Sequence, residues 1–364
     1  FAIEKIISMS IKNLIVSEIN KNGPLTISRF MNHCLYNKNF GYYATKNQPI
    51  GTMGDFITSP EISQVFGELI GLWLVQTWID RGKPSPFSLI ELGPGNGTMM
   101  LDILNATKKF SNFIEPASII LVENSDALKA SQKRILRDYH PIWIDNILDI
   151  PEQPLFLIAN EFLDALPIRQ FKKENNIWHE RYVALSDNDE LHFMYAPSNF
   201  NKELNVLYGG VPNDIIVETS DITQTILSDL SKKILQNGGV CLFIDYGYFE
   251  GVGETLQAVH QHAYAHPLAN LGDTDLTAQV NFRNVFNLFK RKGLRATNLE
   301  NQGNFLLRLG IQQRAEVIAK NLPETKKKLH FDAIDRLIKS DQMGTLFKVM
   351  GVTNEGTPIL PFLE

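Results

Sequence analysis

The sequence contains only two cysteines, Cys34 and Cys241, which stand far apart in apolar surroundings. A disulfide framework or a thiolate metal site needs several cysteines at short spacings, so neither is expected. An excess of basic residues is also missing, because 35 lysines and arginines stand against 40 acidic residues and give a formal net charge of −5. Without a basic stripe to neutralise a phosphate backbone, nucleic acid is not an expected partner.

Long uncharged apolar runs are absent too. No run approaches the roughly 18 residues that a membrane-spanning helix requires, and residues 1–14 lack an apolar segment followed by a cleavage site. We therefore expect an intracellular protein without stable membrane insertion. Its 364 residues, of which 44% are hydrophobic and 21% charged, suffice for a large buried core.

The first 80 residues predict a helical extension. Apolar residues follow helical spacing from Ser10 to Asn20 and from Thr26 to Leu35, and a third helix is expected from Glu61 to Asp80, after Pro60. Residues 40–60 between them are rich in glycine, aromatic and hydroxyl side chains. We assign residues 1–80 to this extension and expect its last part to cover the ligand site of the domain that follows.

From residue 81 onward, short apolar runs alternate with helical segments. Such alternation predicts βαβ units and a parallel sheet covered on both faces, formed by residues 81–168 and 214–364. Strands are expected at Phe87–Leu92, Ser118–Glu123, Pro141–Ile144, Leu155–Asn160, Val240–Asp245 and Gly344–Val352.

Two intervals break this alternation. Residues 169–213 contain three strand-like runs around the turn at residues 186–189 and are interpreted as an inserted β-rich subdomain. Residues 247–281 are loop-like, and a loop of this length in a compact fold indicates a lid or substrate loop. His260, His262 and His266 lie close together in it. No residues to orient them can be recognised, so no metal site is expected.

The strand Phe87–Leu92 leads into Gly93-Pro94-Gly95-Asn96-Gly97, after which a helix is expected. In open α/β sheets the turn after the first strand binds a nucleotide-like ligand. Glycines have no side chain, so they allow such a ligand to approach the backbone closely. The carboxylate of Glu91 would repel the pyrophosphate of a dinucleotide, and Pro94 removes an amide that could bind it. S-adenosylmethionine carries an ammonium and a sulfonium but no phosphate. The loop therefore favours S-adenosylmethionine over NAD, and an NAD-dependent oxidoreductase is the weaker alternative.

Polar residues follow the next strands at the same sheet edge. Glu123 stands where a carboxylate would bind both ribose hydroxyls of either cofactor, with a solvated strand-end acid as the alternative. Asn160, Glu161 and Asp164 follow the fourth strand among apolar residues. Burying such groups without partners is costly, so they indicate a polar ligand. The structural alternatives are a helix cap at Asp164, an ion pair at Glu161 and a turn acid at Asp245, which ends the fifth strand.

Several long motifs occur in one order: residues 54–67 (GDFITSPEISQVFG), the loop after Glu91, residues 160–167 (NEFLDALP) and residues 245–247 (DYG). Together they resemble the MidA-like family of S-adenosylmethionine-dependent methyltransferases, which includes a mitochondrial arginine methyltransferase of complex I assembly. The similarity runs from about Ile11 to the C-terminus. It extends to residues 255–258, 275–277 and 302–306.

The resemblance implies an α/β fold of the class I, Rossmann-like methyltransferase type. Its sheet would have seven mostly parallel strands with the last one antiparallel, together with the N-terminal helical extension and the inserted β-hairpin and loop regions. The cofactor would be S-adenosylmethionine. The residues assigned to it are Glu91, Gly93, Pro94, Gly95, Gly97, Glu123, Asn160, Thr58 and Ser59, with helix capping as the alternative role for the last two.

The resemblance also implies protein arginine N-methylation, with symmetric dimethylation of a core subunit of respiratory NADH:quinone oxidoreductase. The location would be the bacterial cytoplasm or, alternatively, the mitochondrial matrix, and a homodimer is one expected assembly. A guanidinium is a poor nucleophile. Glu161 and Asp164, aided by Asp245, are expected to bind it through charge-assisted hydrogen bonds and to bias its charge away from the attacking nitrogen.

Glu61, Tyr246 and His262 are assigned to substrate binding. The segment Gln279-Val280-Asn281-Phe282 stands where the family commonly has His-Val-Asp-Phe, and Leu271 stands where a proline is usual. If this segment borders the acceptor pocket, substrate choice has shifted. The alternative function, in another class, is an assembly factor that binds the cofactor but acts mainly by holding its partner.

Overall fold

The computed structural model describes residues 10–46, 51, 57–354, 356 and 358–362. The first three residues of the GDFITSPEISQVFG motif therefore lie outside the described part. The chain forms two compact units. Unit 1 consists of residues 1–56, 165–223 and 250–278, and unit 2 consists of residues 57–164, 224–249 and 279–364. Residues 57–80, which we predicted as part of the N-terminal extension, belong to unit 2.

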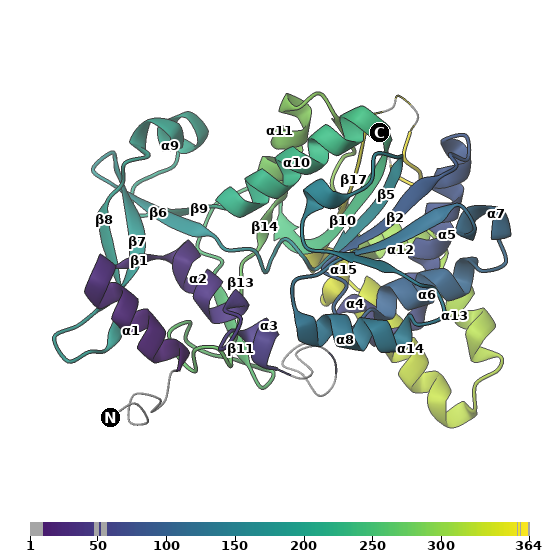
Figure 1. Cartoon of the computed structure of the whole chain (residues 1–364), viewed down its shortest axis with the longest axis horizontal. Coiled ribbons are helices and arrows are strands. Elements are labelled where there is room, and N and C mark those ends of the chain that lie inside the picture. The colour runs from purple at the N-terminus through teal and green to yellow at the C-terminus, as the bar shows by residue number, and fades with distance from the viewer. Residues whose placement is uncertain (1–9, 47–50, 52–56, 355, 357, 363–364) are drawn as a thin grey trace. The chain divides into compact units, whose positions relative to one another are not determined.

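Unit 2 is built on a mixed sheet with the strand order β15–β17–β10–β5–β2–β3–β4. Figure 1 labels β17, β10, β5 and β2 of this sheet. β14 pairs with β10, and β16 pairs with β17. The strands are β2 Phe87–Leu92, β3 Ala117–Val122, β4 Ile142–Ile144, β5 Leu155–Asn160, β10 Gly239–Tyr248, β14 Val280–Asn281, β15 Arg295–Ala296, β16 Glu300–Asn301 and β17 Phe347–Thr353.

The strand directions match the expected class. β10, β5, β2, β3 and β4 run parallel, whereas β17 runs antiparallel to β10. The prediction of a mostly parallel α/β sheet with an antiparallel last strand is thus confirmed. The strand count differs, because the described residues form nine strands rather than seven. β14, β15 and β16 contain two residues each, which is too short for a periodic pattern.

Helices cover both faces of this sheet (Figure 1). On one face Leu69 of α5 and Ile103 of α6 join the sheet residue Leu89 in one buried core. On the other, Phe289 of α11 packs on Phe243 of β10 with ring centroids 5.6 Å apart. The helices are α4 Ser59–Ile62, α5 Gln64–Asp80, α6 Thr98–Thr107, α7 Ser111–Ile114, α8 Asp126–Ile135, the 3-10 helix η2 Ile147–Asp149, α11 Phe282–Arg291, α12 Gln302–Arg308, α13 Ile311–Ala319, α14 Glu324–Ile338 and α15 Met343–Leu346, and α10 Asp221–Asn237 begins in unit 1.

Two predicted elements of unit 2 are corrected by the structure. The helix expected from Glu61 to Asp80 is interrupted at Ser63, whose extended backbone and hydroxyl, 3.3 Å from the amide of Val65, start α5 anew. The strand expected from Gly344 begins only at Phe347, after the short helix α15. At Gly344 a Cβ would lie 2.1 Å from the carbonyl of Ile338, so this turn requires glycine.

Unit 1 joins the N-terminal helices to both inserted intervals. Its larger sheet has the order β1–β7–β6–β9 with β8 on β7, and its smaller sheet has the order β12–β11–β13. The interval 247–281, predicted as loop-like, thus contains short strands. The elements are α1 Ile11–Asn22, β1 Leu25–Thr26, α2 Ile27–Tyr36, α3 Tyr42–Thr45, β6 Arg169–Glu174, β7 Ile177–Leu185, β8 Leu191–Pro197, α9 Asn201–Tyr208, β9 Ile216–Thr219, β11 Gln257–His260, β12 Ala263–Tyr264 and β13 Asp275–Thr277.

The core of unit 1 explains why its three segments fold together. Phe30 and Met31 of α2 are buried in one cluster with Val183 of β7 and Leu276 of β13. Cys34 lies in this cluster, and Cys241 is buried in β10 of unit 2.

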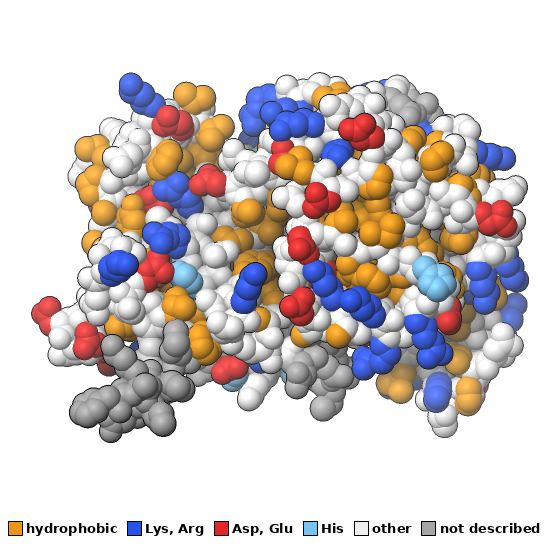
Figure 2. All heavy atoms as spheres, viewed as in Figure 1, with side chains coloured by type: hydrophobic (Ala, Val, Ile, Leu, Met, Phe, Trp, Pro, Cys, Tyr) orange, Lys and Arg blue, Asp and Glu red, His pale blue; other side chains and the backbone are white. Residues whose placement is uncertain are grey.

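None of the helices in the described ranges is both long enough and apolar enough to cross a membrane. Acidic side chains lie among the basic ones on the face drawn in Figure 2.

Candidate functional site

The glycine loop lies between β2 and α6 in unit 2. Gly93, Gly95 and Gly97 have φ angles of 61°, 53° and 85°, a left-handed conformation that side chains rarely adopt. The amide of Gly97 donates to the carbonyl of Pro94 at 2.7 Å, which closes the turn. A Cβ on Gly93 would lie 2.8 Å from the ring of Phe162. The glycines are therefore required by backbone conformation and, at Gly93, by close packing.

Glu91 is the acidic residue that precedes this loop. Its side chain is 2% exposed, and its Oε2 atom has no hydrogen-bond partner in the described part of the chain. Burial raises the pKa of Glu91 to about 8, and the charge of Glu123 adds to the rise, whereas the amide of Met100 lowers it. A buried oxygen without a partner is costly unless a ligand supplies a donor. An ammonium group would satisfy it.

Glu123 follows β3 and is half-buried. Its Oε1 atom accepts hydrogen bonds from the amides of Asn124, at 2.9 Å, and Ser125, at 2.8 Å. Its Oε2 atom accepts from Nε2 of Gln132 at 3.2 Å. Burial raises the pKa of Glu123, while these bonds and Lys129 lower it. The carboxylate is thus held in one orientation, which differs from the alternative of a freely solvated strand-end acid.

The N-terminal motif contacts the glycine loop and the β5 end. Glu61, which we predicted as a substrate residue, accepts hydrogen bonds from Oγ1 of Thr98 at 2.6 Å and Nδ2 of Asn96 at 3.1 Å. The structure therefore places Glu61 against the cofactor loop. The amide of Ser59 donates to Glu161 at 2.8 Å. Thr58 is the N-cap residue of α4, but its side chain makes no capping hydrogen bond.

Glu161 directly follows β5 with a φ angle of 50°, which is uncommon for a residue other than glycine. Its Oε1 atom also accepts from Nδ2 of Asn160 at 3.0 Å. Burial raises the pKa of Glu161 to about 7, and the charge of Asp164 adds to this. Asn160 is 7% exposed, and its Oδ1 atom has no hydrogen-bond partner in the described ranges. This second buried oxygen also fits a cationic or hydroxyl-bearing ligand.

Asp245, predicted as a catalytic residue, accepts three backbone amides. Its Oδ2 atom accepts from Leu163 at 2.9 Å and Asp164 at 3.2 Å, and its Oδ1 atom accepts from Tyr246 at 2.9 Å. Burial raises the pKa of Asp245 well above its ordinary range, and the charges of Asp164 and Glu161 add to this. Because both oxygens face the backbone, the structure gives Asp245 the role of holding the turn at residues 161–164. That Asp245 contacts substrate stays a prediction.

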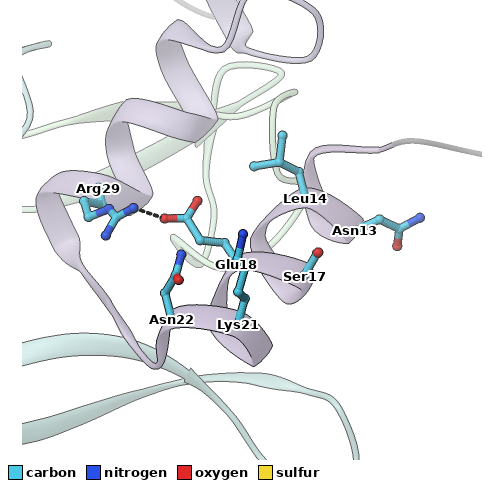
Figure 3. Close-up of a pocket in the computed structure, with 7 residues that line it drawn as sticks. All are labelled: Asn13, Leu14, Ser17, Glu18, Lys21, Asn22 and Arg29. Atoms are coloured by element: carbon cyan, nitrogen blue, oxygen red, sulfur yellow. Dashed lines mark hydrogen bonds and ion pairs between the residues drawn. The ribbon is translucent and has the colours of Figure 1, made fainter.

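The remaining substrate residues lie in different places. Tyr246 is half-buried in β10, with its ring 5.7 Å from that of Phe347. His262 lies in unit 1, in the exposed turn between β11 and β12. A pocket in unit 1, lined by α1 and the start of α2, contains none of the predicted residues (Figure 3). There Glu18 pairs with Arg29 and with His33.

Two buried glutamines near the site were not predicted from their residue type. Gln302 accepts from the hydroxyl of Ser59 at 3.4 Å and donates to the carbonyl of Leu337 at 3.0 Å. Its only signal was its place in the shared segment 302–306. Gln132 donates to the carbonyl of Gly95 and to Glu123. No motif marks it, since its partners lie on other elements.

The parallel sheet, the acidic residue before the glycine loop and the ordered acids at the next strand ends define a class I methyltransferase that uses S-adenosylmethionine. A family described as an S-adenosyl-L-methionine-dependent methyltransferase matches residues 69–299, and the chain belongs to this family. The resemblance, the enzyme class and the cofactor inferred from the sequence are thereby confirmed.

Curated relatives and solved structures agree with this family. The Drosophila melanogaster protein arginine methyltransferase NDUFAF7 homolog, mitochondrial, is 33% identical over 92% of this chain and 83% of its own. Human protein arginine methyltransferase NDUFAF7, mitochondrial, is 32% identical over 91% of this chain and 80% of its own. A Burkholderia thailandensis crystal structure bound to S-adenosyl-homocysteine covers 96% of this chain and 92% of its own, with a TM-score of 0.83 at 24% identity. This last similarity supports the fold.

Proposed function

We propose that this methyltransferase acts on an arginine side chain of a protein substrate, with Glu161 and Asp164 binding the guanidinium. The observation that carries the proposal is an acidic pair held at the carboxyl end of β5, with Phe162 between the two packed against Gly93 of the cofactor loop. The names of the curated relatives, which are protein arginine methyltransferases, support arginine over other acceptors.

The cofactor would be held by the residues whose hydrogen-bonding capacity is unused. The buried Oε2 of Glu91 and Oδ1 of Asn160 fit the methionine end. Glu123, which two backbone amides and Gln132 orient, fits the ribose. The backbone of the loop can approach the cofactor closely at Gly93, Gly95 and Gly97, and we assign Pro94 of the same loop to cofactor binding as well. Thr58 and Ser59 are assigned to the segment that covers the cofactor. When bound, S-adenosylmethionine supplies a methyl group activated by its sulfonium.

The acids would solve the two problems of a guanidinium acceptor, which is delocalised and positively charged. Charge-assisted hydrogen bonds from the guanidinium to Glu161 and Asp164 fix its orientation and draw its charge away from the attacking nitrogen. Methylation releases one proton from that nitrogen. Glu161, with a pKa raised to about 7, is suited to accept this proton near neutral pH. Asp245 contributes indirectly by holding the turn that carries both acids.

The finer assignments follow from the family resemblance. We propose the core subunit of respiratory NADH:quinone oxidoreductase as the substrate, with symmetric dimethylation of its arginine. The curated relatives are mitochondrial by name, which supports the matrix over the bacterial cytoplasm as the compartment. A homodimer stays a prediction, as do the substrate roles of Tyr246 and His262.

The decisive experiment measures transfer of labelled methyl groups from S-adenosylmethionine into a partner proteome, followed by acid hydrolysis and analysis of the methylated amino acids. Wild-type protein is expected to yield methylarginine. Glu161→Gln keeps the shape of the side chain but removes its charge and its capacity to accept a proton. We expect it to lower turnover by about 10²- to 10⁴-fold while S-adenosyl-homocysteine still binds.

Glu316→Gln is the matched control, since Glu316 is an exposed carboxylate on α13 and should leave turnover unchanged. Unchanged turnover of Glu161→Gln with cofactor bound would refute the role of Glu161. Label in lysine or another residue would refute the arginine assignment. Absence of label with every partner, despite cofactor binding, would favour the assembly factor that holds its partner without methylating it.

A further inference from the structure

Gln132 is a completely buried glutamine on α8 that connects two parts of the cofactor site. Its Nε2 atom donates to the carbonyl of Gly95 at 2.8 Å and to Oε2 of Glu123 at 3.2 Å. Its Oε1 atom accepts from Nε1 of Trp143 on β4 at 2.8 Å. One side chain thus joins the glycine loop, the acid after β3 and the neighbouring strand β4.

The orientation of the Gln132 amide is fixed by its partners. An indole nitrogen can only donate, so the oxygen of the amide must face Trp143. Both hydrogens of Nε2 then point to acceptors, the carbonyl of Gly95 and the carboxylate of Glu123. The side chain also lies under the loop, because a Cβ on Gly97 would be 3.2 Å from Cγ of Gln132. Neither the amide nor the loop can shift without breaking one of these contacts.

These bonds determine what Glu123 can still accept. A carboxylate offers about four acceptor positions. Two backbone amides use Oε1 and Gln132 uses one position of Oε2, so the remaining position on Oε2 is set by the same amide that holds Gly95. The pKa of Glu123 is raised by burial, and the hydrogen bond from Gln132 is among the contacts that lower it. Gln132 therefore helps to keep this acid charged.

We propose that Gln132 is a positioning residue for S-adenosylmethionine, which fixes the orientation of the ribose-binding carboxylate of Glu123 relative to the glycine loop that holds the methionine end. The inference rests on the proposed contact between Glu123 and the ribose. It does not depend on the identity of the acceptor, so binding of S-adenosyl-homocysteine without any substrate can test it.

Gln132→Met removes the amide at nearly constant volume. We expect it to weaken binding of S-adenosyl-homocysteine by about 10- to 100-fold, the loss that is typical when a residue orienting a metal-binding side chain is removed. The pH profile should change as well. Glu123 loses a donor, so its pKa rises, and the loss of affinity on acidification should begin at a higher pH than in the wild type. Calorimetric titration from pH 6 to pH 8 measures both effects.

Gln132→Glu should show the opposite pH trend. At pH 8 the introduced carboxylate repels Glu123, whereas at pH 6 the pair can share a proton, and the protonated group can again donate a hydrogen bond. Relative to the wild type at the same pH, the affinity of this variant should thus improve on acidification while that of Gln132→Met declines. A merely structural role would give both variants the pH profile of the wild type, which would overturn the proposal.

Gln170→Met is the matched control in unit 1. Gln170 is equally buried, donates to the carboxylate of Glu218 at 2.7 Å and accepts from Arg181 at 3.0 Å. Its loss should lower the melting temperature but leave the affinity for S-adenosyl-homocysteine and its pH profile unchanged. If Gln132→Met does not fold, Trp143→Phe removes the orienting indole donor instead. The same shift of the pH profile, at smaller size, is then expected.

Glu123→Gln tests the contact between Glu123 and the ribose separately from the positioning role of Gln132. If this variant binds S-adenosyl-homocysteine as the wild type does, the proposed ribose contact is wrong. If Glu123→Gln weakens binding, the double variant with Gln132→Met should bind S-adenosyl-homocysteine almost as well as the single variant with the lower affinity, because both changes act through one carboxylate. Additive losses would show that Gln132 acts independently of Glu123 and would overturn the proposal.

Discussion

Two buried glutamates, one in each unit, differ in how their oxygens are used. Glu218 in unit 1 accepts hydrogen bonds from the amide and the hydroxyl of Thr255 and from Gln170. Glu91 in unit 2 is more deeply buried, yet its Oε2 atom has no partner in the described ranges. Burial raises the pKa of both residues. The same residue type is thus satisfied by the fold in one unit and left incomplete in the other.

We propose that this difference distinguishes Glu218, a structural acid, from Glu91, a ligand-binding acid. Glu218 connects β9 to the residues that precede β11, and its network is complete without a ligand. Two of the buried oxygens without partners in the described ranges, on Glu91 and Asn160, lie at the carboxyl ends of adjacent strands, β2 and β5. Two such atoms at neighbouring strand ends of one sheet fit a place where a ligand contributes to the structure. Unit 2 contains this place.

The largest expected effect comes from filling the glycine loop. Gly93→Val introduces a branched side chain where the φ angle is 61° and the Phe162 ring leaves no room. We expect binding of S-adenosyl-homocysteine to fall at least about 100-fold and methyl transfer to be lost, as measured by calorimetry and labelling.

Gly82→Val is the matched control, since Gly82 also has a positive φ angle, of 79°, but open space around it. It should lower stability and spare affinity. Equal affinity losses in both variants would show that backbone strain, rather than the loop's position, explains the effect. Retained activity of Gly93→Val would remove the loop from the site.

The sequence predicted the central sheet well, for a physical reason. β2 and β5 have the predicted bounds because every residue in them is buried, so each is a near-continuous apolar run that ends where the polar site residues begin. Short strands such as β14 and β15 escaped prediction because their formation depends on neighbours in the sheet. The interruption at Ser63 depends on one side-chain hydrogen bond, which periodicity does not reveal.

The sequence indicates which polar residues stand at the strand ends, but it does not indicate which contacts their side chains make. Strand ends collect polar residues at one sheet edge, so the acids could be listed from the sequence. Which acid faces a ligand depends on contacts across the fold. Asp245 proved to accept backbone amides from the turn after β5, and Glu61 to contact the loop before α6. Gln132 carried no signal because its three partners lie on separate elements.

The second prediction concerns the pH dependence of activity. Glu161 must be ionised to bind the guanidinium and take its proton, and burial raises its pKa to about 7. The ratio kcat/KM, which reports on the free enzyme, should therefore rise about tenfold per pH unit below 7 and level off above it. In Glu161→Gln this limb should disappear. A limb that persists in the variant would assign the titration to another group.

The third prediction compares proton release. The pKa of Glu91 is raised to about 8 without cofactor, so at pH 7 the residue is mostly protonated. An ammonium ligand favours the ionised form of Glu91. Binding of S-adenosyl-homocysteine should therefore release about one proton per site. Calorimetry in buffers of different ionisation enthalpy measures this release. Glu91→Gln should abolish it, whereas Glu218→Gln should leave it unchanged. Release that survives Glu91→Gln would place the titrating group elsewhere.

The last prediction concerns stability, and it compares the two glutamates directly. The pKa of Glu91 is raised on folding from its ordinary value of 4.5 to about 8, so the folded state binds more protons than the unfolded state between these values. Stability is then lost as pH rises through this window, by on the order of 3 kcal/mol up to pH 7. Glu91→Gln should flatten this decline, measured as free energy of unfolding from pH 5 to pH 8 without cofactor.

Glu218→Gln should instead destabilise unit 1, by about 1–3 kcal/mol, because an amide cannot accept all the hydrogen bonds that the carboxylate receives from Thr255 and Gln170. The same substitution thus removes a cost in the incomplete site and breaks a complete network in the other unit. Equal destabilisation at both positions would mean that Glu91 is satisfied within the fold. The distinction between a structural acid and a ligand-binding acid would then fail for this chain.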